Sequence, residues 1–206
     1  MPRTENESVQ RNHWGLAVLA LLREREMHPY EMRRLMRERH KEERLVLKSG
    51  SLYNAIEWLE KTGLIKAART SRQGKRPQRT VYRITSDGEA ELLKWLREFI
   101  SMPVREPSTF AVALDHLIHL SPTDAATQIE ARINRLEPQV ELMECMLKML
   151  APKIGRINLL EIEFEKVLFQ AEIRWLQQLL ADIRSGALAW DIDQILEYLR
   201  KFAPHL

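Results

Sequence analysis

The sequence has one cysteine, seven glycines and no long apolar run. A single cysteine excludes an intramolecular disulfide, so a reducing cytoplasm is the simplest compartment. The glycines form no glycine-rich loop, which argues against a nucleotide-binding cradle. The longest apolar stretch, Leu16 to Leu22, has seven residues, whereas a membrane span needs about 20. The polar N-terminus also lacks the apolar segment of a signal peptide. We therefore expect a cytoplasmic protein with no membrane partner.

The chain also lacks the groupings that carry catalysis. No Ser-His-Asp set, paired-carboxylate signature or cofactor loop stands out, so we expect neither an enzyme nor a cofactor. His116 and His119 are three residues apart, a spacing that can hold a metal. No cysteine lies near them and Asp115 is the only adjacent acid, so we predict ordinary histidines and no metal. Cys145 is a redox-sensor candidate if it is exposed, but we predict a buried, inert cysteine. A sensing role for these residues stays open.

Charge is distributed unevenly along a nearly neutral chain. The 206 residues carry a net charge of +3. Residues 1–101 have 21 basic and 14 acidic side chains, and residues 102–206 have 11 and 15. The basic excess lies in one island, Lys61 to Arg83, with eight basic residues and no acidic ones. The first half is therefore the part that can meet a polyanion.

The first half reads as helices followed by a hairpin. Apolar spacing predicts helices over 14–25 and 29–39 and from Ser51, a natural N-cap, to Gly63, which fits a left-handed helix end. Residues 64–71 and 80–85 have the pattern of strands, with a turn between them. Another helix follows from residue 86. This order predicts a winged helix-turn-helix with a two-stranded wing over residues 1–101.

The second half, residues 102–206, reads as long helices. Pro103 and Pro107 mark the boundary, and a cap at Ser121 opens a helix that we expect to continue, kinked, through Pro138. Its apolar residues alternate at spacings of four and three, the pattern of a coiled-coil seam. This seam comprises Ile129, Ile133, Leu136, Val140, Met143, Leu147 and Leu150. The expected fold class is therefore mainly α, with a C-terminal α-helical, coiled-coil-like dimerisation domain.

A second long helix, over about 158–185, carries two apolar stripes. One stripe contains Leu160, Phe164, Leu168, Ala171, Trp175, Leu179 and Ile183, and the other contains Ile162, Phe169, Ile173, Leu176 and Leu180. A helix that is apolar on two faces must bury both. One stripe can face its own chain and the other a partner chain. For dimerisation we predict the seam from Ile129 to Leu147 and the stripe from Phe169 to Leu180.

A winged helix-turn-helix places its third helix in the major groove and its wing on the flanking backbone or minor groove. At the start of the third helix, polar side chains suited to reading bases are predicted at Ser49, Ser51, Tyr53 and Asn54. Basic side chains suited to phosphate contacts are predicted at Lys61, Arg72, Lys75, Arg76 and Arg79. The expected partner is double-stranded DNA.

Several motifs in these elements resemble the PadR family of transcriptional regulators. They are Met27-His28-Pro29-Tyr30-Glu31-Met32, Gly50-Ser51-Leu52-Tyr53, Leu59 to Ile65, Gly74-Lys75-Arg76-Pro77 and Val81 to Gly88. The C-terminal half is similar to the longer subclass with a helical Vir-like domain. The resemblance implies a homodimeric repressor, released by a ligand or stress signal, in which the Tyr53 hydroxyl contacts a phosphate. Pro29, Asn54 and Trp58 depart from the family pattern. The departures at Asn54 and Trp58 affect the expected DNA contacts and not the expected fold.

We therefore expect a homodimeric regulator that binds a palindromic operator. Trp95, Trp175 and Trp190 are candidates to line an effector pocket, although aromatic residues at helical spacing are more often core. Two other classes stay open. One is a helical dimer whose basic face binds an acidic protein, and the other is an effector-binding sensor whose DNA activity is secondary.

Overall fold

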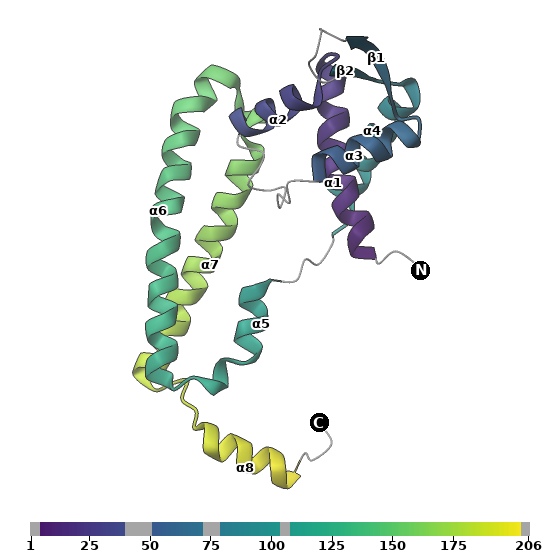
Figure 1. Ribbon diagram of the computed structural model, residues 1–206. Helices are drawn as coiled ribbons and strands as arrows, with labels where there is room; N and C mark the ends of the chain where they lie inside the picture. Colours follow the sequence, from purple (N-terminus) through teal and green to yellow (C-terminus); the bar gives the residue numbers. More distant parts are fainter. Residues whose placement is uncertain (1–4, 40–50, 72–78, 104–107, 203–206) are drawn as a thin grey trace. The chain divides into compact units, whose positions relative to one another are not determined.

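The structure is a computed structural model that describes residues 5–39, 51–71, 79–103 and 108–202 (Figure 1). The chain divides into two compact units, Met1–Arg105 and Glu106–Leu206. We call them unit 1 and unit 2. The described residues are mostly helical with one two-stranded antiparallel sheet, so the predicted fold class is confirmed.

The described residues of unit 1 form four helices and a hairpin. These elements are α1 (Glu5–Glu24), α2 (Pro29–Glu38), α3 (Ser51–Lys61), β1 (Ile65–Ser71), β2 (Arg79–Ile84) and α4 (Ser86–Ser101). The predicted turn chemistry is confirmed at Gly63, whose φ of 76° is left-handed. α1 begins nine residues before the predicted start, because a polar segment with no apolar stripe can still extend a packed helix. Ser51, predicted as an N-cap, is the first helical residue of α3.

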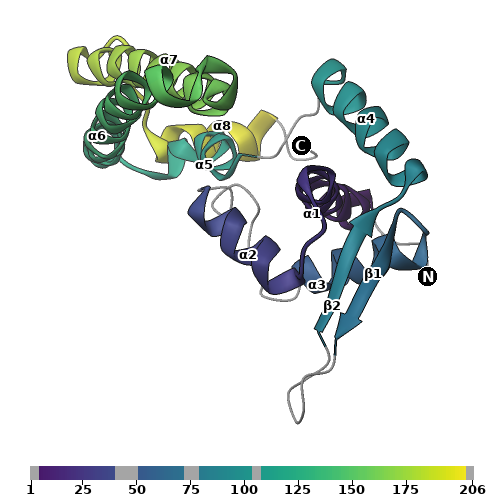
Figure 2. The same ribbon diagram turned by 90° about the horizontal axis from the view of Figure 1, so that it is seen from above.

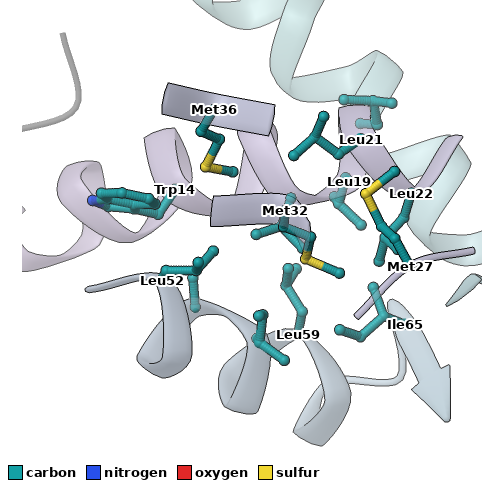
Figure 3. Close-up of a cluster of buried hydrophobic side chains, with 14 of the residues drawn as sticks. Trp14, Leu19, Leu21, Leu22, Met27, Met32, Met36, Leu52, Leu59 and Ile65 are labelled. Atoms are coloured by element: carbon teal, nitrogen blue, oxygen red, sulfur yellow. The ribbon is translucent and has the colours of Figure 1, made fainter. Parts of the chain in front are cut away.

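The core of unit 1 lies where α1, α2 and α3 meet. Figure 3 shows Leu19 and Leu22 of α1, Met32 and Met36 of α2 and Leu52 and Leu59 of α3 around a common centre. Leu19, Met32 and Leu59 are wholly buried. α2 begins as its sequence predicts, with Pro29 in the first turn and the His28 ring Nδ1 accepting from the Tyr30 N–H at 3.1 Å. This core positions α3 against the rest of unit 1.

Unit 2 is built on a pair of long helices. Its elements are α5 (Thr109–Asp115), a 3₁₀ turn at Leu117–His119, α6 (Pro122–Ile154), a 3₁₀ turn at Arg156–Asn158, α7 (Leu160–Ser185) and α8 (Ile192–Phe202). Ser121 caps α6 by accepting from the Asp124 N–H, as predicted, and the helix continues through Pro138. Among the described residues, no helix is both long and apolar enough to cross a membrane.

α6 and α7 lie side by side and run antiparallel (Figures 1 and 2). The ion pairs between them show this direction, because Glu130 near the start of α6 meets Arg184 near the end of α7, whereas Glu144 farther along meets Lys166. Between the helices, Ile129, Ile133 and Leu136 pack with Ile173, Leu176 and Leu180. Leu176 is wholly buried.

Candidate nucleic-acid interface

α3 presents one face to the core of unit 1 and the other to solvent. Its buried side chains are Leu52, Ala55, Ile56 and Leu59. Of the predicted base-reading residues, Tyr53 and Asn54 lie on the solvent face, with Tyr53 50% exposed. Lys61 lies on the same face two turns after Tyr53 and is also exposed. Ser49 and the Ser51 side chain lie outside the described residues.

The hairpin of β1 and β2 carries the next part of the basic island. The strands are antiparallel, with Ile65 opposite Ile84 and Thr70 opposite Thr80, and an irregularity between Ala67 and Arg69. Figure 2 shows the two strands side by side next to α3. Among the predicted phosphate contacts, Arg72, Lys75 and Arg76 and the Arg79 side chain lie outside the described residues. The Arg79 backbone lies in β2, as the strand pattern predicts within one residue.

Two basic residues outside the predicted set of phosphate contacts lie directly across this hairpin. Lys66 of β1 is the register partner of Arg83 of β2, and both are exposed. Like charges directly opposite each other destabilise a pair of strands. Their spacing in the sequence carries no signal, because register becomes visible only when the strands pair. The arrangement concentrates two positive charges on one face of the hairpin.

Tyr82 fastens the hairpin to the rest of unit 1. Its N–H and C=O pair with the C=O and N–H of Met27 at 3.1 and 3.2 Å, so the turn between α1 and α2 makes an isolated antiparallel bridge to β2. Its hydroxyl donates to the Glu60 carboxylate of α3 at 3.3 Å. Burial and the nearby Glu60 charge raise the pKa of the Tyr82 hydroxyl. One residue therefore connects the hairpin, α3 and the α1–α2 turn.

Three consecutive residues at the end of α1 add ion pairs to this corner. Glu24 pairs with Arg39 at 2.5 Å, Arg25 with Glu31 at 2.6 Å, and Glu26 with Arg69 of β1 at 3.4 Å. The hydrogen bond from Arg25 lowers the pKa of the Glu31 carboxyl. Each exposed pair contributes little stability, but together they orient α2 and β1 about one end of α1.

Most of the residues predicted for dimerisation pack in the hydrophobic core of unit 2. Ile129, Ile133 and Leu136 are buried against Ile173, Leu176 and Leu180 of the same chain, and Val140 and Phe169 pack against this cluster. Met143 and Leu147 are half-buried farther along α6. The seam is therefore used within the chain, because alternating spacings of three and four describe the contact of any two such helices, whether in one chain or two.

The other stripe of α7 is exposed to solvent over most of its length. Its exposed large side chains are Leu160, Phe164, Leu168 and Trp175, and we call these, with the neighbouring exposed Val167, the outer stripe of α7. Phe164 is 65% exposed. Large apolar side chains gathered on one face of a helix mark an interaction surface. The two stripes read from the sequence thus separate into an inner face against α6 and, from Leu160 to Trp175, a largely exposed outer face. Leu179 and Ile183, at the end of this other stripe, pack with the inner cluster.

The three tryptophans proposed for an effector pocket have different surroundings. Trp95 is 5% exposed in the core of unit 1 and stacks on Trp58, with ring centroids 5.9 Å apart. In unit 2, the Trp190 indole N–H donates to the Leu120 carbonyl at 2.8 Å. Trp175 is 48% exposed and lies edge-on to Phe110, whose ring faces the Arg132 guanidinium at 3.9 Å. Trp95 and Trp190 therefore stabilise the fold through packing and a hydrogen bond. Trp175 has exposed surface that an effector could contact.

The histidine and cysteine candidates are both at the surface. His116 and His119 are exposed, with ring centroids 6.3 Å apart, and the described residues hold no group of three or more side chains able to bind a metal ion. Cys145 is exposed, so the prediction of a buried cysteine is wrong. Its position on α6 is outside the alternating seam, which explains its exposure.

The chain is similar to known proteins in both sequence and fold. A model of the transcriptional regulator PadR-like family matches residues 18–94. No curated protein matches the sequence. Bacillus subtilis PadR in complex with operator DNA superposes with a TM-score of 0.62 and 21% identity, covering 82% of this chain and 98% of that one. The same protein in complex with p-coumaric acid gives 0.67 and 20%, covering 82% and 97%.

A third structure, the Vibrio cholerae virulence activator AphA, gives a TM-score of 0.59 at 17% identity and covers 84% of this chain and 99% of that one. Because more than four fifths of the chain is covered, the likeness of fold extends from unit 1 into unit 2. The region matched by the family model contains α2, α3, the hairpin and most of α4. Residues 18–94 of this chain, which carry the candidate interface, therefore match the model of the transcriptional regulator PadR-like family.

Proposed function

We propose that this protein is a sequence-specific DNA-binding transcriptional regulator whose α3 enters the major groove while the hairpin contacts the neighbouring backbone. The main observation behind this proposal is that the outward face of α3 lies beside a basic hairpin, in a region that matches a family of transcriptional regulators. In the related solved structure, B. subtilis PadR is bound to operator DNA. We propose that this protein acts in the cytoplasm.

The paired charges of Lys66 and Arg83 support this assignment. Two cations held directly opposite each other repel in the free protein. A phosphate between them relieves the repulsion and releases counterions, so the arrangement favours a polyanion over solvent. Opposite charges at these two positions would instead stabilise the pairing of the strands.

The test is a salt titration of binding to the promoter of the protein's own gene, followed by gel shift or fluorescence anisotropy. Sequence-specific binding requires higher affinity for this promoter than for random-sequence competitor at each salt concentration. The competing function is a helical dimer whose basic face binds an acidic protein. Equal affinity for promoter and random DNA at every salt concentration favours that alternative.

Replacing Lys66 and Arg83 together with alanine is expected to weaken binding to all DNA sequences alike. The slope of log K against log salt should fall in magnitude by about 2, because each lost phosphate contact contributes roughly 0.9. Thermal stability should not fall, since the substitution removes a repulsive pair. The matched control replaces Lys94 and Arg97 of α4, two exposed cations away from the hairpin. A control slope reduced by the same amount contradicts phosphate contact by the hairpin.

We propose that the regulator is a homodimer and that the outer stripe of α7 faces a second copy. Two recognition helices must be about 34 Å apart, or a multiple of this distance, to meet successive major grooves of a palindrome. The stripe is apolar, exposed and located in unit 2, whereas the hairpin and α3 belong to unit 1. Sedimentation of the full chain at micromolar concentration tests this point, and a monomer contradicts it.

We further propose that the protein represses transcription and is released by a small-molecule or stress signal. A ligand that favours a conformation with a different spacing of the two α3 helices shifts the population away from DNA. B. subtilis PadR in complex with p-coumaric acid supports a small-molecule effector, and the half-exposed Trp175 beside Phe110 and Arg132 is our candidate contact. Deleting the gene should raise transcripts from the bound promoter. A fall identifies an activator, which is what the related AphA is named.

A further inference from the structure

An acidic residue lies in the middle of the outward face of α3. Tyr53, Glu57 and Lys61 follow one another at intervals of four residues, about one helical turn each, so they form one stripe along the helix. The Glu57 side chain is 72% exposed and that of Lys61 is 77% exposed. The Glu57 Oε1 is 3.7 Å from the Lys61 Nζ, which is beyond hydrogen-bond distance. The carboxylate therefore keeps its capacity to accept hydrogen bonds.

The second acid at this end of α3 has a different role. Glu60 accepts from the Tyr82 hydroxyl at 3.3 Å and so holds the hairpin against α3. Glu57 makes no such contact with β1 or β2 in the described residues, and its charged neighbour is Lys61 of the same helix. Glu60 thus contacts the hairpin within unit 1. Glu57, three residues earlier, faces the solvent, where the proposed DNA ligand would lie.

A carboxylate is a poor neighbour for DNA unless a hydrogen-bond donor meets it. Double-stranded DNA carries about one negative charge per 1.7 Å of its axis, so an acid on the approaching face lowers affinity for phosphate. In the major groove, guanine offers acceptors, and thymine offers an acceptor and a methyl group. Adenine offers an amino donor beside its N7 acceptor, which would repel a carboxylate, and cytosine offers an amino donor alone. Glutamate is therefore matched to cytosine N4, which donates to it.

We infer that Glu57 is a specificity-determining residue that accepts a hydrogen bond from the N4 amino group of a cytosine in each operator half-site. The inference rests on the proposed function and adds to it one base that α3 recognises. Asn54 lies three residues before Glu57, about 4.5 Å along the helix, which is close to the roughly 3.4 Å step between base pairs. The cytosine read by Glu57 is then adjacent to the base pair read by Asn54. Lys61, at the far end of the stripe, is left to neutralise phosphate.

The experiment selects bound sequences from a random DNA library with the full-length protein and four variants. Glu57→Ala should lose the preference for one C·G pair per half-site, with discrimination there falling about 5- to 150-fold. Glu57→Gln should move that preference from cytosine to adenine, because glutamine bonds to adenine N6 and N7. Since Glu57 is exposed, both variants should fold, as circular dichroism will show. Unchanged base preferences in both variants overturn the inference.

Two control variants distinguish base reading from a general charge effect and from an effect on Lys61. Glu60→Gln removes the same charge from the same helix and keeps a side-chain oxygen that can accept from the Tyr82 hydroxyl, so it should keep the wild-type base preferences. The same lost preference in this variant shows that any charge change on α3 suffices, and overturns the inference. Lys61→Ala should weaken binding to all sequences and keep the cytosine. If Lys61→Ala loses the cytosine as Glu57→Ala does, Glu57 acts by positioning Lys61, and the inference is also overturned. A wild-type protein that selects no motif contradicts the proposed function itself.

Discussion

Gly88→Ala is expected to unfold unit 1 or to destabilise it by about 3 kcal/mol or more, at the upper end of what overpacking costs. A Cβ on Gly88 would lie 2.1 Å from the Leu64 backbone oxygen and 2.9 Å from Ile84 Cγ1. The first turn of α4 cannot withdraw easily, because the Thr85 side chain caps it and the Thr85 N–H donates to the Leu64 carbonyl at 3.1 Å. Urea unfolding followed by circular dichroism measures the loss.

The matched control is Gly63→Ala, which changes a glycine of the same unit for a different reason. Gly63 has a φ of 76°, and a Cβ added to it would have nothing within 4 Å. Alanine there should cost only the conformational penalty of a left-handed residue, about 1 kcal/mol. If the two variants lose the same stability, the close approach of α4 to Leu64 is not what requires glycine at position 88.

Replacing Phe164 and Leu168 together with glutamate is expected to convert the dimer into a monomer and to weaken operator binding about 10²- to 10⁴-fold. The loss arises because a dimer binds its second half-site at high effective concentration, and a monomer does not. Four charges placed against each other at a two-fold interface would repel, whereas the same residues in a monomer are solvated. Sedimentation and operator affinity measure the two effects.

The control for this variant is Gln177→Glu with Ala181→Glu. These residues are exposed and also one turn apart on α7, but they lie off the outer stripe. They add the same number of acidic side chains to the same helix and should leave the dimer intact. A dimer lost in both variants, or in neither, contradicts the assignment of the interface to the outer stripe.

Local rules predicted the elements of both units well. Capping and turn chemistry at Pro29, Gly63 and Ser121 depend on the few residues around each position, and the structure confirms them. The change of period from helix to strand after Gly63 likewise identified the hairpin. These signals are read within one turn or one strand, so they survive without knowledge of the tertiary structure.

The same local rules do not predict which residues far apart in the sequence come into contact. The spacing from Ile129 to Leu147 predicts a helix that packs on another helix, but it does not say to which chain the second helix belongs. The contact between Met27 and Tyr82 is a single pair with no period, and Lys66 meets Arg83 only through strand register. Glu57 belongs to no motif, and its role is suggested only when α3 is seen with one face buried.

Tyr82 has a consequence for the thermodynamics of binding. Through its backbone it holds the α1–α2 turn, through its hydroxyl it holds α3, and its ring packs against the core of unit 1. The paired strands and α3 are thus assembled before any ligand arrives. Association then has little backbone entropy to lose in these elements, and a larger share of the contact energy is expressed as affinity.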